Sequence, residues 1–405
     1  MNSRMNVSRL IAEVDALLSE SATSVRQREE TAFDDAVGTR GRSLVLFGAG
    51  NLGRKTLAGL RQCGIEPLAF ADNNPKLWHT QIEGLNVLSL PEAARQYGRS
   101  AAFVCTIWGA GHAETMGNHI DRLHAAGCEV ATPFSTLFWK FPDVFLPHYS
   151  LDLPHKVLES AGEIRRACRI WADDASRNEF LAQLRWRTHL DIDGLPRPVA
   201  HEQYFPDDLF QLTPDEAFVD CGAYDGDTIK ALVRQRGASF GPIESFEPDP
   251  DNLRKLNYAV SLLPAHIRAK VRVHPCAVGS RTQTLRFNAE GKASSSVGEG
   301  TLEVNCVDLD HYLSDRKPTF IKMDIEGFEP EALAGATRTI RRHVPILAIC
   351  CYHLQDHLWR LPLLMRSLSE EYRLFLRPHD LAAWDLVCYA VPLRRLGALP
   401  AQLDA

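Results

Sequence analysis

The sequence predicts an α/β fold with two sheets, a smaller one in the first third of the chain and a larger one in the second half. Twice, in residues 43–53 and 218–228, an apolar segment leads into a glycine-rich turn and then into a helical pattern. This order is typical of a strand, a tight turn and the start of a helix. From residue 217 onward, strand-like and helical segments alternate, which indicates parallel βαβ units in one open sheet. At 405 residues, the chain has room for two or three domains.

Composition and charge exclude several classes of protein. The net charge of −6 offers no general attraction to nucleic acid, so we expect a small-molecule or glycan acceptor as the partner. No apolar run reaches the roughly 18 residues of a membrane span. The ten cysteines are scattered without a CxxC pair, which favours reduced core thiols over disulfides or zinc ligands. Acidic residues interrupt what would be the apolar core of a signal peptide, so we expect a cytoplasmic protein.

Residues 1–42 are predicted to contain one helix and a linker. Apolar residues recur at helical spacing over residues 7–20, which predicts an amphipathic helix. Such a helix serves equally well for forming a homodimer or for covering a neighbouring domain. Residues 19–41 are rich in polar and charged side chains, and we expect them to be the linker.

Residues 43–135 are predicted to form a Rossmann-like domain. A strand at residues 43–47 leads into Gly48, Gly50 and Gly53, which match the GxGxxG pattern, and a helix follows. The next strand ends at Asp72, roughly 20 residues after the last glycine, where a carboxylate would contact a ribose hydroxyl. These four residues are therefore candidates for a second nucleotide site. The same glycines also permit close packing of the helix on the sheet, so the motif leaves both interpretations open.

Residues 136–212 are predicted to be a helical and aromatic region that connects the two sheets. The aromatic and proline-rich segment 133–154 suits an interdomain core better than a substrate platform. Helical periodicity follows over residues 156–189, and a turn at residues 204–208 comes directly before the second sheet. A loop at that place can close over a ligand pocket.

Residues 213–405 are predicted to form the catalytic domain, which begins with the segment FVDCGAYDGDTI. Glycines suit this turn because the backbone must approach a bound group closely. The carboxylates on both sides of the turn disfavour a bare phosphate, whereas the sulfonium and amino groups of S-adenosylmethionine fit them. The candidate cofactor contacts in this segment are Asp220, Gly222, Ala223, Asp225, Gly226 and Thr228.

The ends of the second and third strands offer further cofactor contacts. Glu247 and Pro248 follow the strand at residues 243–246, and Glu247 lies about 20 residues after the last glycine, where a carboxylate accepts ribose hydroxyls. A helix-capping role is the alternative, but Asp249 is better placed for it. Ala277 and Val278 follow the strand at residues 271–274, and small residues there would let a flat adenine lie against the strand end.

The ends of the fourth and fifth strands carry the candidate catalytic residues. Alternation along the strand at residues 319–325 places Lys322, Asp324 and Glu326 on one side, and buried carboxylates require a partner or a ligand. His353 ends the strand at residues 345–351 and is a candidate general base, because its ordinary pKa is about 6.5. Asp324 and Glu326 are the other catalytic candidates, and Asp324 also borders the predicted cofactor site. The two carboxylates alternatively suit a divalent metal, whose presence the sequence does not decide.

The ordered motifs of this half resemble the FkbM-type family of S-adenosylmethionine-dependent methyltransferases. The resemblance is carried by FVDCGAYDGDTI, SFEPDP, CAVGS, IKMDIEGFEPEAL and CYH, and it covers residues 200–395. It implies a seven-stranded doubly wound class I methyltransferase sheet that ends in an antiparallel hairpin. It also implies S-adenosylmethionine as cofactor and O-methylation of a hydroxyl on a sugar, glycan or related natural product. The N-terminal domain resembles nucleotide-binding halves of sugar-modifying enzymes, which suggests an activated or polymer-linked sugar.

Two other functions remain open at this point. One is an NAD(P)-dependent oxidoreductase or sugar-modifying enzyme centred on residues 48–53, although no Tyr-xxx-Lys pair follows at a fitting place. The other is a non-catalytic protein that binds S-adenosylmethionine. Binding measurements with S-adenosylmethionine and NAD⁺ distinguish the oxidoreductase from the other two, and methyl transfer distinguishes an enzyme from a binding protein.

Overall fold

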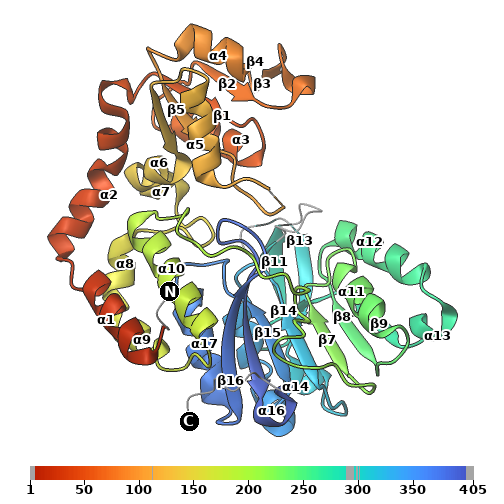
Figure 1. Cartoon of the computed structure of the whole chain (residues 1–405). Coiled ribbons are helices and arrows are strands. Elements are labelled where there is room, and N and C mark those ends of the chain that lie inside the picture. The colour runs from red at the N-terminus through yellow and green to blue at the C-terminus, as the bar shows by residue number, and fades with distance from the viewer. Residues whose placement is uncertain (1–4, 112, 289–295, 298–299, 301, 398–405) are drawn as a thin grey trace.

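The computed structural model places the two predicted sheets in two bodies, one above the other in Figure 1. It describes residues 5–111, 113–288, 296–297, 300 and 302–397. Within these residues, no helix has both the length and the apolar character needed to cross a bilayer. The ten cysteines are free thiols, as the scattered spacing predicted.

Two helices form the start of the chain, where we expected one helix and a linker. Helix α1 (Val7–Leu18) begins after Asn6, whose side chain accepts a hydrogen bond from the Arg9 backbone N–H (2.9 Å). Its buried face packs against α9 (Ala161–Ala167) and α10 (Asp174–His189). The expected linker is instead α2 (Ala22–Val37), which runs along the left of Figure 1 and contacts β6 (Val130–Pro133), α6 (Phe134–Lys140) and α8 (Pro154–Glu159). The prediction failed because α2 is mostly polar and buries a sparse stripe, namely Val25, Glu29, Phe33 and Val37.

The N-terminal body contains a six-stranded sheet in the order β3-β4-β2-β1-β5-β6. All pairs are parallel except β3 with β4. Its elements are β1 (Leu44–Phe47), α3 (Asn51–Gln62), β2 (Ala69–Asp72), β3 (Gln81–Ile82), β4 (Leu85–Ser89), α4 (Leu90–Tyr97), β5 (Ala102–Cys105), α5 (Met116–Ala125) and β6 (Val130–Pro133). The strands predicted at residues 43–47 and before Asp72 are β1 and β2, but the sequence analysis missed β3 and β4, which are short or lie toward the edge of the sheet.

Short helices fill the region between the sheets. The aromatic segment forms α6 (Phe134–Lys140) and α7 (Pro142–Phe145), which pack into the core of the N-terminal body. The single helix expected at residues 156–189 is divided into α8 (Pro154–Glu159), α9 and α10. The division before α10 has a local cause, since the Asp173 side chain accepts from the Ser176 backbone N–H (2.9 Å) and caps a new helix.

The C-terminal body is built on a seven-stranded sheet in the order β16-β17-β15-β14-β7-β8-β9. Five strands are parallel, and β17 is antiparallel to both of its neighbours, as the resemblance implied. The strands are β7 (Phe218–Cys221), β8 (Ile243–Phe246), β9 (Val271–His274), β14 (Phe320–Met323), β15 (Ile346–Cys350), β16 (Tyr372–Pro378) and β17 (Leu386–Pro392). The helices are α11 (Asp227–Arg236), α12 (Pro250–Ser261), α13 (Ala265–Arg268), α14 (Leu309–Tyr312), α15 (Glu329–Ala334), α16 (Thr337–His343) and α17 (His357–Leu368).

A small accessory sheet follows β9 in the order β10-β13-β11-β12. Its strands are β10 (Ala277–Val278), β11 (Gln283–Asn288), β12 (Ser296–Val297) and β13 (Leu302–Val307). Strands β11 and β13 form an antiparallel pair.

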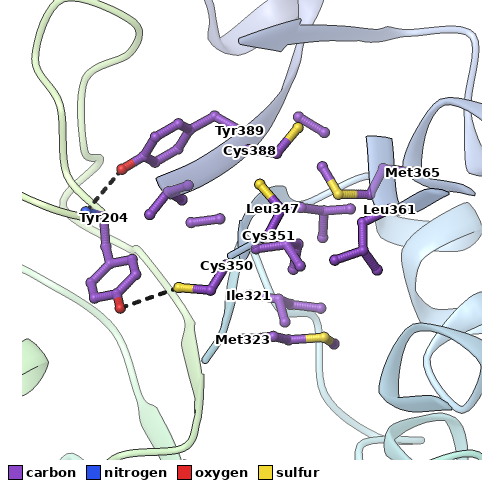
Figure 2. Packing of buried hydrophobic residues seen from close by; sticks show 14 of the residues in the cluster. Tyr204, Ile321, Met323, Leu347, Cys350, Cys351, Leu361, Met365, Cys388 and Tyr389 are labelled. Atoms are coloured by element: carbon purple, nitrogen blue, oxygen red, sulfur yellow. Dashed lines mark hydrogen bonds between the residues drawn. The ribbon is translucent and has the colours of Figure 1, made fainter. Parts of the chain in front are cut away.

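The core of the C-terminal body holds the central strands rigidly. Figure 2 shows Ile321 and Met323 of β14, Leu347 of β15 and Leu361 and Met365 of α17 packed together, and all are fully buried. Burying side chains of this size contributes about 1.5–3 kcal/mol each. On the other side of β15, the Tyr204 backbone N–H donates to the Tyr389 hydroxyl (3.0 Å) and anchors the segment before β7. The carboxyl ends of the strands are therefore well supported.

Candidate active site

A cavity of about 400 Å³ lies at the carboxyl end of the seven-stranded sheet. It spans the point where strand order reverses, between β14 and β7, which is where open α/β sheets bind ligands. Asn51 and Ala110 of the N-terminal body and Tyr149 of the connecting region also line it. The two bodies thus enclose one site, which the sequence did not predict.

The glycine-rich turn after β7 forms one wall of the cavity. Gly222 has a φ of +78°, and a Cβ on it would lie 1.9 Å from the Asp324 backbone oxygen, so no other residue fits there. Gly226 has a φ of +83° and precedes α11. Of the six candidates in this segment, Gly222 and Thr228 line the cavity. Ala223, Asp225 and Gly226 are not among the lining residues, and Ala223 and Gly226 are buried within the turn.

Asp220 also lies behind the wall and acts through Lys322. Its side chain is fully buried and forms an ion pair with Lys322 (3.2 Å), which donates a hydrogen bond to the Gly222 backbone oxygen (2.6 Å). Burial alone would lower the pKa of Lys322, but the charges of Asp220 and Asp324 raise it. Lys322 lines the cavity and Asp220 does not, so Asp220 positions the turn, and its direct contact with the cofactor remains a prediction.

Glu247 and Pro248 line the cavity beside the turn. The Glu247 carboxylate accepts hydrogen bonds from the backbone N–H groups of Tyr224 (2.8 Å) and Asp249 (2.9 Å). Burial raises the pKa of Glu247 to about 7. A carboxylate has about four acceptor positions, so two remain for a ligand's hydroxyls. Asp249 caps α12, as the sequence predicted.

The third strand end completes this part of the cavity. Ala277 and Val278 line it as β10, together with Phe246. Tyr224, which the sequence analysis did not select, also lines the cavity with a φ of +47°. Its position between two candidate residues of the turn was the available signal.

A cluster of carboxylates surrounds His353 at the ends of β14 and β15. Its Nε2 lies 3.2 Å from Asp324 Oδ1 and 3.6 Å from Glu326 Oε1, and its Nδ1 lies 2.9 Å from Glu329 Oε1. Burial opposes the charged form of His353, but the charges of Glu329 and Glu326 raise its pKa well above the ordinary value. Asp324 and Glu326 line the cavity, whereas His353 lies behind them. The neighbouring carboxylates therefore favour the protonated form of His353, and its expected role as general base remains a prediction.

Among the described residues, one group could hold a metal ion, and it consists of Asp324, Glu326 and His353. One ligand atom from each lies within 4.8 Å of the others, and carboxylates of this kind suit magnesium or calcium. Nε2 would have to lose its proton to bind an ion, so the imidazolium and a metal are alternatives at this position. Burial would raise the pKa of Asp324, but the hydrogen bond from His353 and the charge of Lys322 hold it below the ordinary value.

Four residues that the sequence analysis did not assign to the site complete the other wall. The Tyr204 and Tyr352 hydroxyls donate to the Asp324 carboxylate, at 2.8 and 3.4 Å. Trp384 and Asp385, from the loop before β17, also line the cavity. Tyr352 was visible in the CYH motif, but no local pattern marks residues 384 and 385.

The glycine-rich loop of the N-terminal body follows a strand and precedes a helix as predicted, but the Asp72 carboxylate accepts hydrogen bonds from nearby backbone N–H groups. A Cβ on Gly53 would lie 2.0 Å from the Gly48 backbone oxygen, which accounts for glycine at that position by packing alone. Asp72 accepts hydrogen bonds from the backbone N–H groups of Ala49 and Asn74, both at 2.7 Å. Asn51, directly after Gly50, faces the shared cavity. Nucleotide binding at Gly48, Gly50, Gly53 and Asp72 remains a prediction.

Residues 220–379 match the family model of the methyltransferase FkbM domain, and this range includes the turn, Glu247 and the His353 cluster. Residues 220–379 form an FkbM methyltransferase domain. The chain is therefore an enzyme, and the family of this domain implies S-adenosylmethionine as the methyl donor. The seven-stranded sheet and its hairpin ending agree with that assignment.

The fold of the whole chain also has a solved relative. It is similar to methyltransferase FkbM from Methylobacillus flagellatus KT, with a TM-score of 0.74, 24% identity and coverage of 95% of this chain and 98% of the other. That likeness extends over both bodies and shows the shared fold. A SAM-dependent methyltransferase from Aquifex aeolicus matches 45% of this chain and 84% of its own at 13% identity, and the TM-score of 0.27 is too low to establish a shared overall fold. Among curated proteins, no significant sequence match was found.

Proposed function

We propose that this FkbM methyltransferase transfers a methyl group from S-adenosylmethionine to a hydroxyl oxygen of an uncharged sugar, glycan or related natural product. One observation carries the proposal. A single cavity joins the glycine-rich turn and Glu247 on one side of the strand reversal to Asp324, Tyr352 and Asp385 on the other. A methyl donor and an acceptor can therefore lie side by side.

The chain's residues on the first side suit S-adenosylmethionine. Gly222 and Thr228 let the methionine part approach the backbone, Glu247 accepts the ribose hydroxyls, and Ala277 and Val278 flank the adenine. The bound cofactor supplies an activated methyl group on a sulfonium. Holding it in line with the acceptor oxygen supplies much of the rate enhancement in such a displacement.

The charge of the cavity supports an acceptor without phosphate. Its lining includes five carboxylic acids and one lysine, namely Asp227, Glu247, Asp324, Glu326, Asp385 and Lys322. Carboxylates repel an anionic acceptor but accept hydrogen bonds from hydroxyl groups. Aromatic rings on the acceptor side, from Tyr149, Tyr352 and Trp384, offer apolar faces for a sugar ring or a similar scaffold.

Isothermal titration of the full chain tests the proposal, with S-adenosylmethionine, NAD⁺ and a nucleotide sugar titrated separately. We expect micromolar binding of S-adenosylmethionine. Transfer of labelled methyl groups is then measured on a panel of neutral methyl glycosides and their 6-phosphates. We expect product with neutral members and little with the phosphates. Binding of NAD⁺ alone would favour the oxidoreductase, and cofactor binding without transfer to any hydroxyl would favour a binding protein.

A further inference from the structure

The loop between β16 and β17 enters the cavity in an unusual backbone conformation. Ala382, Ala383 and Asp385 have φ values of +56°, +69° and +49°, although none is glycine. Such conformations cost on the order of 1–3 kcal/mol each and persist where surrounding contacts impose them. The result is that Trp384 and Asp385 both line the cavity, opposite the glycine-rich turn.

The N-terminal body imposes this conformation from above. Trp108, in the segment after β5, donates a hydrogen bond from Nε1 to the Ala382 backbone oxygen (3.0 Å). The Gly111 backbone N–H donates to the Asp380 carboxylate. The centroid of the Trp384 ring lies 4.7 Å from the ring centroid of Trp108 and 4.5 Å from that of Tyr149. The N-terminal body thus contacts the loop that carries Asp385 through Trp108 and Gly111.

The other ionisable groups around the acceptor side are already engaged. Both oxygens of Asp324 accept from tyrosine hydroxyls, and Oδ1 also faces His353. Glu326 faces His353 Nε2. Both nitrogens of His353 face carboxylates. A group that takes a proton during methyl transfer must reach the acceptor and have a free oxygen or nitrogen. Asp324 has both oxygens engaged and His353 lies behind the cavity wall, so neither meets both conditions. Glu326 lines the cavity and faces His353 through Oε1 alone, which leaves it as the competitor of Asp385.

Resting on the proposed O-methyl transfer, we propose that Asp385 is the general base of the reaction and that Trp108 is the residue that positions it. The acceptor hydroxyl gives its proton to the Asp385 carboxylate. The acceptor oxygen forms its bond to the methyl carbon while the carbon–sulfur bond breaks. The electron pair of that bond stays on sulfur, so the products are the methyl ether, neutral S-adenosylhomocysteine and a protonated Asp385.

The electrostatics of Asp385 agree with this role. Burial raises its pKa to about 7, the charges of Asp324 and Asp380 add to the effect, and His353 and the Tyr352 hydroxyl oppose it. A base is most effective when its pKa lies near the working pH. Because Asp385 must be ionised to accept the proton, turnover should rise as pH increases through about 7.

Two variants and one acceptor-independent measurement test the proposal. Asp385→Asn removes the base, and we expect the rate of transfer to the best neutral glycoside to fall about 10²- to 10⁴-fold with unchanged affinity for S-adenosylmethionine. Trp108→Phe keeps an aromatic ring but removes the N–H donor, and we expect a lower kcat with an unchanged KM for S-adenosylmethionine. Asp35→Asn, on the exposed face of α2, is the control and should behave as wild type.

Carbon NMR of the aspartate carboxyls, in the full chain bound to S-adenosylhomocysteine, measures the titration of Asp385 directly. The signal absent from Asp385→Asn, or from Asp385→Ser if the first variant does not fold, is the one to follow. We expect its midpoint between about pH 6 and 8, with a lower midpoint in Trp108→Phe because the loop admits more water. A midpoint below about pH 5, or an Asp385→Asn variant with wild-type turnover, would overturn the proposal. If the wild-type chain binds no S-adenosylmethionine, the proposed function fails instead.

Discussion

The affinity for S-adenosylmethionine should depend on pH through Glu247. In the free protein, burial raises the pKa of this carboxyl to about 7, against the two backbone N–H donors that favour ionisation. Ribose hydroxyls need the ionised form as acceptor. Binding is therefore strongest above pH 7 and weakens as pH falls through that value.

The size of the effect follows from the position of the pKa. For a single group of pKa about 7, the dissociation constant rises about tenfold at pH 6, because one pKa unit corresponds to about 1.4 kcal/mol. The dissociation constant stops rising once it reaches the value for the protein with protonated Glu247. Glu247→Gln imitates that state, and we expect it to weaken binding at pH 8 by about 1–3 kcal/mol through lost charge-assisted hydrogen bonds.

Isothermal titration between pH 5.5 and 8.5 measures both effects. The Glu247→Gln profile also corrects for titration of the ligand's own amino group, since that contribution is the same in both proteins. We expect a sloping wild-type profile that approaches that of the variant at low pH. Parallel profiles for the two proteins would show that Glu247 does not bind through its charge, and equal affinities at pH 8 would refute its assignment to the ribose.

Two further substitutions test how the glycine-rich turn is held. Asp220→Asn leaves the buried Lys322 charge without this partner and should lower the free energy of unfolding, measured in urea, by about 3–5 kcal/mol. The exposed control Asp35→Asn should change it by less than about 0.5 kcal/mol. A small effect of Asp220→Asn would show that the ion pair is dispensable. Gly222→Ala forces a Cβ to within 1.9 Å of a backbone oxygen and should abolish cofactor binding. Gly162→Ala, which meets open space, should leave binding unchanged, and wild-type affinity in Gly222→Ala would contradict the described geometry.

Much of the fold was readable from the sequence because its signals are local. The strand, turn and helix at residues 218–228 depend on a turn whose backbone conformation favours glycine. Gly222 has the positive φ that such a turn requires. The same holds for Gly48 in the N-terminal body, with a φ of +112°. The polar helix α2 was missed because its composition resembles a linker, and its few apolar contacts come from tertiary packing.

The sequence by itself determined the two sheets, the glycine-rich turns and the carboxylates at the strand ends, since each of these follows from neighbours in the chain. It did not determine which of those groups line the cavity. Asp220 lies behind the cavity wall, where it pairs with Lys322. His353 also lies behind the wall, where it pairs with Glu329. Asp385 lies in the cavity because its neighbours in the loop contact Trp108 and Tyr149. These two residues are more than 200 positions away from the loop in the chain. Such pairings depend on how two bodies pack, and no local pattern of residues records them.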